Sequence, residues 1–275
     1  MGEATGRAQL TLRARKPGYA VIQECLAIQS AAPTRTRWQR FWGRDPLHPE
    51  ARSWFKGAIG ERDVARALDA LGPEYTVLHA VPVGKRSTDI DHVVVGPTGV
   101  FSINTKNHAG HRVWVGGRTL MVDGQRTPHV LRAVAEGERA TALLSAAAGG
   151  PILVRPVLVV AAASLQFGDK PPAVETLTPD QVRDWITGLP RVHSDEAVRY
   201  LTMLAEERRT WHVDAIVLND TLRHVQRFER LEREIEVARR RRTVFRKGGA
   251  VAVLAVPAGA VLGYWWATAS IALGA

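Results

Sequence analysis

Apolar and polar positions between residues 75 and 163 follow the patterns of β-strands. Residues 75–81 (YTVLHAV) predict one strand, and residues 89–106 (DIDHVVVGPTGVFSINTK) predict two strands joined by a Gly-Pro-Thr-Gly turn. A second hairpin is expected in HRVWVGGRTLMVDG, with its turn at Gly116 and Gly117. The continuous apolar run ILVRPVLVVAAA predicts a strand buried on both faces.

Apolar residues recur at helical spacing on both sides of these strands. Residues 54–71 predict a helix that ends at a Gly-Pro pair, and residues 130–147, 179–187 and 195–209 are expected to be helical as well. Residues 221–242 carry one apolar stripe along a strongly charged helix, which could pack on the same domain or on a second chain. Together the elements indicate an α/β fold.

The first hairpin carries polar residues at its open end. If the residues flanking the turn face each other, positions that sum to 195 pair, so Asp91 faces Asn104 and Asp89 faces Lys106. Directly opposite Cβ atoms lie roughly 5 Å apart, close enough to form one site. The residues alone leave two interpretations open. They form either a metal-binding site with a catalytic lysine, or a cross-strand salt bridge between Asp89 and Lys106 on an exposed sheet face.

The chain ends in a long uncharged stretch. Residues 248–275 contain no charged side chain over 28 positions, and about 20 apolar residues are enough to cross a bilayer. The preceding run RRRRTVFRK, residues 239–247, is basic, and such runs stay on the cytoplasmic side. We therefore expect a single-pass cell-membrane protein with its N-terminal domain in the cytoplasm. A buried core helix or a re-entrant segment is the alternative.

Composition narrows the classes of partner. A net charge of +10 and a pI near 10.4 favour an anionic partner, either nucleic acid or an acidic membrane surface. The single cysteine, Cys25, excludes an internal disulfide framework and a thiolate zinc site. Residues 1–50 are rich in Arg, Pro and Gly, which predicts a basic, poorly ordered lead-in that either contacts an anionic surface or is simply solvated.

Two sequence blocks carry a resemblance to a known family. The helix GAIGERDVARAL, followed by DIDHVVVGPTGVFSINTKNHAGHRVWV, resembles the NERD family, the nuclease-related domain. The likeness is best over residues 54–145 and weaker up to about residue 211. It implies a restriction-endonuclease-like, PD-(D/E)xK-type fold over residues 51–212, with a mixed β-sheet flanked by helices. Residues 213–247 would then be a charged helical connector to the membrane helix.

The resemblance also implies roles for individual residues. Glu61 matches the acidic residue of the first helix, Asp91 the metal-binding aspartate, and Lys106 the catalytic lysine. Nucleases of this class usually present glutamate two residues before the lysine, where this chain has Asn104. We expect Mg²⁺ or Mn²⁺ to be held by Asp91 and Glu61, with the Asn104 amide and the Thr105 carbonyl completing the site.

Some neighbouring residues have secondary interpretations. Asp89 is a further possible metal ligand that could compensate for the missing charge at Asn104. His108 and His111 could ligate a metal, although a solvated loop is the simpler interpretation, and His92 should pack on the opposite face of the sheet.

Two functions from different classes follow. The first is a membrane-tethered, metal-dependent nuclease that hydrolyses phosphodiester bonds of DNA, which we favour over RNA. The second is a catalytically weak or inactive nuclease-fold module that binds nucleic acid or a protein partner at the membrane. Neither interpretation specifies an oligomeric state.

Overall fold

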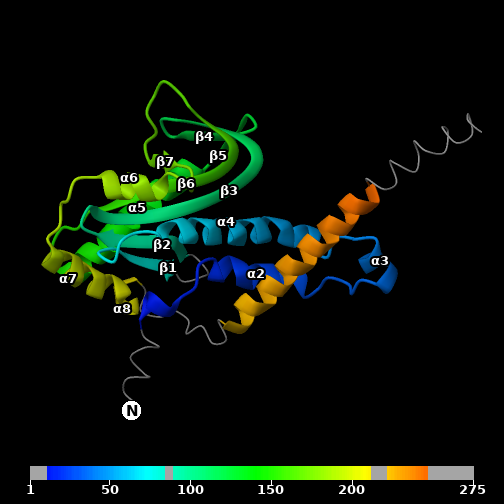
Figure 1. The fold of residues 1–275 in the computed structure, drawn as a ribbon. Helices are drawn as coiled ribbons and strands as arrows, with labels where there is room; N and C mark the ends of the chain where they lie inside the picture. The colour runs from blue at the N-terminus through cyan, green and yellow to red at the C-terminus, as the bar shows by residue number, and fades with distance from the viewer. Residues whose placement is uncertain (1–10, 84–88, 212–221, 247–275) are drawn as a thin grey trace, which may run out of the picture.

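The computed structural model describes residues 11–83, 89–211 and 222–246. A mixed sheet of seven strands lies at its centre (Figure 1). Strands β1 to β5 follow one another as antiparallel neighbours, and β3 also pairs in parallel with β6, which pairs in parallel with β7. The strands are β1 (Thr76–Pro82), β2 (Asp89–Gly96), β3 (Gly99–Gly116), β4 (Thr119–Val122), β5 (Gln125–Thr127), β6 (Val154–Phe167) and β7 (Glu175–Leu177).

The first hairpin has the register predicted from its turn. Val95 lies opposite Val100 and His92 opposite Ile103, so paired positions sum to 195 as expected. The second hairpin, between β3 and β4, has its turn at Gly117 and Arg118, one residue later than expected, because Gly116 still pairs with Thr119. Strand β3 is long because it continues past β2 and runs along β6, with a register shift between His108 and Arg112.

Helices cover both faces of the sheet. On one face, α4 and α6 pack on apolar residues of β2, β3 and β6, as Val64 and Phe101 illustrate. On the other face lie α5, α7 and α8, which contribute residues such as Leu144, Leu201 and Trp211. The bounds of these helices are α4 (Arg52–Leu68), α5 (His129–Ala148), α6 (Val182–Gly188), α7 (Asp195–Glu206) and α8 (Arg208–Trp211).

The N-terminal segment differs from the expected poorly ordered lead-in. From residue 11 to residue 51 it forms η1 (Leu12–Ala14), α2 (Tyr19–Gln29), α3 (Arg37–Phe41) and η2 (Pro49–Ala51). Tyr19, Ile22 and Cys25 on α2 are buried: Ile22 and Cys25 pack in a cluster with Phe228, and the Tyr19 hydroxyl lies 3.2 Å from Nδ1 of His224. The order of this segment comes from tertiary packing against residues about two hundred positions later, which a local reading of composition does not detect.

A long helix over residues 222–246, drawn in orange in Figure 1, runs beside α2 and α4. Its apolar stripe packs on the domain, since the rings of Phe228 and Phe55 lie 5.2 Å apart. Arg62 on α4 also donates to Glu232 at 2.8 Å. We call this element the C-terminal helix. Of the two packing arrangements open from sequence, the structure has the one within the chain.

The membrane expectation concerns a different part of the chain. Within the described ranges, no helix combines the length and the apolar character needed to cross a bilayer. The stretch at residues 248–275, on which that expectation rests, lies outside the described residues.

Candidate active site at the fork between β2 and β3

Strands β2 and β3 separate where their polar residues begin. Their regular ladder ends at the pair of His92 and Ile103, and β3 then continues along β6 with Asn104 opposite Leu158. Beyond this point the Asp91 side chain links the two strands, since the Thr105 backbone N–H donates to Asp91 Oδ2 at 2.6 Å. The separation places Asp91 beside the polar residues of β3 at the point where the ladder ends, which we call the fork.

Helix α5 brings a further acid to the fork, Glu136, which the sequence analysis did not identify. The amide nitrogen Nδ2 of Asn104 donates to Glu136 Oε2 at 3.0 Å. Gly137 makes this approach possible, since a Cβ there would lie 2.8 Å from Cβ of Pro156 on β6. The available signal was a glutamate beside the buried, small residues Ala133, Gly137 and Ala140 of one helix face.

Helix α4 brings Glu61 toward the same place. Glu61 is buried and accepts a backbone hydrogen bond from Gly18, the residue that precedes α2. The neighbouring Gly60 has a packing role, because a Cβ there would lie 2.8 Å from Cβ of Asn107 on β3. The Gly-Glu pair thus combines close approach of helix and strand with a carboxylate on the buried side of the helix.

Burial raises the pKa values of the three carboxylates of Glu61, Asp91 and Glu136, which we call the acidic cluster. Burial is the main cause for each residue, and the charge of Asp91 further raises the pKa of Glu61 and of Glu136, the latter to about 8. The positive charge of Lys106 lowers all three pKa values. These mutual effects group the cluster around Lys106, whose ammonium donates to the Thr105 carbonyl at 2.9 Å.

Asp89 forms its salt bridge with Arg15 and not with Lys106, the partner that the sequence suggested. Its Oδ2 accepts from Arg15 Nη2 at 2.8 Å, and both side chains are largely buried. Burial raises the pKa of Asp89 to about 6, although the charge of Arg15 acts in the opposite direction. The salt bridge of Asp89 is therefore made with Arg15, and Lys106 lies among the acidic cluster.

This geometry can be compared with known proteins. Residues 56–161 match NERD, the nuclease-related domain family. A segment of 67 residues is 45% identical to an uncharacterized protein of Bacillus anthracis and covers 23% of this chain and 30% of that protein. No solved structure matches. The NERD match spans the fork and α5, and it supports a nuclease-like fold for this part of the chain.

The donor atoms within the NERD match suit an oxygen-preferring cation. In the described ranges, no three His, Cys, Asp or Glu side chains are arranged to hold a metal by themselves. However, Asn104 Oδ1 and Glu136 Oε1 are buried without a hydrogen-bond partner in this part of the chain. Carboxylate and amide oxygens are ligands that Mg²⁺ accepts, and Mg²⁺ retains several waters. The residues present therefore fit a divalent cation held by a mixed set of oxygens.

Three side-chain contacts that involve histidine lie within the NERD match. His108 belongs to β3 and its Nε2 lies 3.1 Å from Nε2 of His129, at the start of α5, while His111 contacts Asp123 at 2.7 Å. These two residues thus lie on a strand near its register shift, and not in a loop. His92 is buried, with Nδ1 2.9 Å from Nδ1 of His79.

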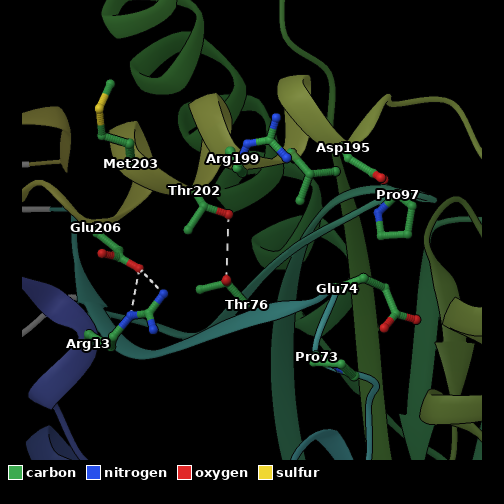
Figure 2. A pocket seen from close by; sticks show the side chains of 11 residues that line it. Arg13, Pro73, Glu74, Thr76, Pro97, Asp195, Arg199, Thr202, Met203 and Glu206 are labelled. Carbon is green, nitrogen blue, oxygen red and sulfur yellow. Dashed lines mark hydrogen bonds and ion pairs between the residues drawn. The ribbon is translucent and has the colours of Figure 1, made fainter.

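A cavity of about 490 Å³ lies elsewhere, between α7 and the start of β1 (Figure 2). On one side of it Arg13 and Glu206 form an ion pair at 2.6 Å, and Thr202 donates to Thr76 at 3.5 Å. None of its lining residues belongs to the fork. Its lining carries charges of both signs, from Arg13, Glu74, Asp195, Arg199 and Glu206, and α7 lies outside the NERD match, so we assign the cavity no catalytic role.

Proposed function

We propose that the chain is a membrane-tethered, metal-dependent nuclease-like protein that hydrolyses phosphodiester bonds of DNA. The observation that carries this proposal is the grouping of buried carboxylates and Lys106 around the fork, with unpaired oxygens on Asn104 and Glu136. Carboxylates beside a lysine are a general solution for phosphodiester hydrolysis. The NERD match and the mixed sheet flanked by helices support a restriction-endonuclease-like core.

Glu136 supplies the acid that the strand lacks. Asn104 stands where nucleases of this type usually carry glutamate, and Glu136 on α5 reaches the same point through its hydrogen bond with the Asn104 amide. In our proposal Asp91, Asn104 and Glu136 hold Mg²⁺ or Mn²⁺, with Glu61 and the Thr105 carbonyl as adjacent oxygens. The cation, when bound, neutralises phosphate charge and lowers the pKa of a bound water.

The other groups of the fork orient and stabilise the reacting atoms. Lys106 carries a positive charge at the fork and stabilises the negative charge that develops on the phosphoryl oxygens. The Thr105 N–H fixes Asp91 Oδ2, so the second oxygen of this carboxylate has a defined direction. Glu61 accepts from the Gly18 backbone N–H, and burial together with the charge of Asp91 raises its pKa, so this carboxyl would lose its proton when a cation binds at the fork.

The second part of the proposal is that a C-terminal membrane helix holds the domain on the cytoplasmic side of the cell membrane. The uncharged residues 248–275 follow a basic run directly, a pattern typical of a single membrane-spanning helix with the preceding domain in the cytoplasm. The net charge of +10 favours nucleic acid as the substrate of that domain.

Cleavage assays on the full chain in detergent test the catalytic part. Supercoiled plasmid and single-stranded DNA are incubated with Mg²⁺ or Mn²⁺, and the variants are Asp91→Ala, Lys106→Ala and Glu136→Gln. We expect cleavage that requires the metal and falls at least about 100-fold in each variant. Asp180→Ala, at an exposed acid outside the fork, serves as the matched control and should retain full activity.

The second candidate function is a module without catalysis, and the observation that favours it is Asn104 in the position of an acid. Such a module would use the nuclease-like fold to hold DNA or a protein partner at the membrane. Folded protein that binds Mn²⁺ weakly, binds DNA and fails to cleave it with every metal would contradict the nuclease proposal and support this alternative.

A further inference from the structure

Helix α3 and the last turns of the C-terminal helix form a surface that contains no residue of the fork. The ring of Phe245 lies 4.6 Å from that of Trp42 and 5.2 Å from that of Phe41, and Trp38 contacts Phe41 at 6.1 Å, centroid to centroid. We call these four aromatic residues and the arginines around them the arginine-aromatic surface. Two segments about two hundred residues apart in sequence thus build one apolar cluster.

Backbone features hold this surface in place. Thr36 and Gln39 cap α3 reciprocally, since each side chain bonds the backbone N–H of the other. Gly43 has a φ of +72°, and a Cβ there would lie 2.5 Å from the Ala238 carbonyl oxygen of the C-terminal helix. Arg241 also donates to the Arg40 carbonyl at 2.7 Å. The segment is therefore fitted to the helix and is not a loose tail.

The aromatic residues of this surface remain largely outside the core. Trp38 is 72% exposed, Trp42 55%, Phe41 50%, and the adjacent Val244 66%. Single exposed apolar side chains are common on soluble proteins, but a contiguous group that includes two tryptophans indicates a partner surface. Tryptophan in particular is enriched at the boundary between lipid and water, because its ring is apolar and its N–H is polar.

Arginines surround the aromatic residues. A cavity of about 340 Å³ between α3 and the C-terminal helix is lined by Arg35, Arg40, Arg230, Arg233 and Arg241, with Glu234 as its acid. Glu234 is already paired with Arg35 at 2.7 Å. In the described part of the chain, no ion pair involves the exposed Arg37, Arg239, Arg242 or Arg246. The surface thus has a clear excess of positive charge.

The sequence that follows identifies the partner. The C-terminal helix is described up to Arg246, and after Lys247 come the 28 uncharged residues of the stretch at 248–275. If this stretch enters a bilayer, as the proposed function has it, the end of the helix lies at the membrane surface. We infer that the arginine-aromatic surface binds an anionic phospholipid bilayer, with the aromatic rings at the interface and the arginines on lipid phosphates.

Such a contact would have a consequence beyond anchoring. A single spanning helix fixes a domain to the membrane but leaves its orientation free, whereas a second contact beside it defines which face turns toward the lipid. Charge alone would also suit nucleic acid. The exposed aromatic group and its place beside the uncharged stretch favour the bilayer, and nucleic acid becomes an outcome of the test.

The experiment places spin labels on the full chain in vesicles. Trp38→Cys and Met203→Cys are labelled separately with Cys25 retained, since the native thiol is buried and protected from the label, and Met203 is an exposed residue of α7. The protein is reconstituted into vesicles of phosphatidylglycerol and phosphatidylcholine, or of phosphatidylcholine alone. Relaxation by oxygen and by a water-soluble nickel chelate gives the depth of each label.

We expect the label at residue 38 to lie at the lipid interface on vesicles containing phosphatidylglycerol and to be more exposed to water on phosphatidylcholine alone. The reference label at residue 203 should stay in water on both. Combined substitution of Arg239 and Arg242 by glutamate should move the first label into water. Resistance of the protein to carbonate extraction reports separately on insertion of residues 248–275, so loss of the anchor is distinguishable from loss of the surface contact.

Two results would overturn the inference. The first is a label at residue 38 that is as accessible to the nickel chelate as the label at residue 203 while the protein resists carbonate extraction. The second is a label that DNA immobilises but phosphatidylglycerol does not, which would assign the surface to nucleic acid. Because Trp38 is exposed and its substitution leaves the core intact, misfolding does not confuse either result.

Discussion

Two regions of the molecule concentrate charge in opposite ways. At the fork, the acidic cluster of Glu61, Asp91 and Glu136 is buried, and burial raises the pKa of each carboxyl. At the arginine-aromatic surface, residues such as Arg239 and Arg242 are exposed and solvated. Buried like charges destabilise the folded chain, whereas exposed arginines change its stability little.

Because of this difference, we expect a ligand at the fork to stabilise the folded protein, and a ligand at the arginine-aromatic surface to bind without doing so. A cation at the fork would neutralise charges that the fold has already desolvated, so its binding should stabilise the protein. A lipid at the arginine-aromatic surface meets side chains that are already satisfied by water, so it should change location and orientation with little effect on stability. The following predictions test this contrast, beginning with the largest effect.

Phe228→Ala should separate the two regions. This ring is fully buried against Phe55 and joins the C-terminal helix to the domain, so its loss should lower the free energy of unfolding by about 3–5 kcal/mol. The arginine-aromatic surface includes residues of the C-terminal helix and should be lost with its docking, whereas the fork includes none and should persist. Urea denaturation measures the loss, and Val237→Ala, at a half-exposed position of the same helix, is the control. A loss below about 1 kcal/mol would show that the helix is only loosely attached.

The pH dependence of stability should carry the signature of the acidic cluster. Burial raises the pKa of Glu136 from the ordinary 4.5 to about 8, so the folded protein retains a proton that the unfolded chain releases between these values. Stability contributed by this group is therefore present at low pH and is lost as pH rises through that window, by on the order of a few kcal/mol.

Glu136→Gln should remove this part of the slope, since glutamine does not titrate. Urea denaturation of both proteins without metal, from about pH 5 to about pH 9, provides the comparison. Parallel curves for the two proteins would mean that Glu136 is solvated in the native state. Mn²⁺ at alkaline pH should stabilise the natural chain more than the variant. The cation can neutralise the Glu136 carboxylate after it has lost its proton, and glutamine has no such charge.

The hairpin at the centre of the fork was predictable because its signals are local. The Gly-Pro-Thr-Gly turn and the alternation on either side of it determine the register, and the observed pairs of His92 with Ile103 and Val95 with Val100 agree with the prediction. The separation of β3 from β2 at the open end of the hairpin was not predictable in the same way. The ladder ends because β3 follows β6, whose sequence begins some fifty residues later.

Residues that depend on distant partners were missed or misjudged. Glu136 reaches the fork because Gly137 lets α5 approach Pro156, and helical periodicity alone does not fix that rotation. Asp89 was considered as the partner of Lys106, but its partner is Arg15 from the N-terminal segment. That segment is ordered by the cluster it shares with Phe228, and its composition alone suggested the opposite. Tertiary contacts override local pattern in all three cases.

Asn104→Asp should sharpen the description of the fork. The substitution replaces the amide that donates to Glu136 Oε2 at 3.0 Å with a carboxylate oxygen, so the metal-free protein should lose about 1–3 kcal/mol of stability. Mn²⁺ affinity should rise at the same time, because a charged ligand replaces a neutral one. Denaturation and calorimetric titration measure the two effects. Gln125→Glu, which adds the same charge at an exposed position of β5, should show neither. Unchanged affinity would remove residue 104 from the proposed ligand set.

Trp38→Ala should have the smallest effect on stability, and this small effect completes the comparison. The side chain is 72% exposed, so the expected change in unfolding free energy is within about 0.5 kcal/mol. Trp211→Ala, by contrast, removes a ring that is 2% exposed and donates to the Ala205 carbonyl at 2.7 Å, with an expected loss of about 3–5 kcal/mol. Thermal denaturation of both variants decides the point. A large loss for Trp38 would mean that its ring stabilises the fold, and its exposure would then no longer argue for a partner.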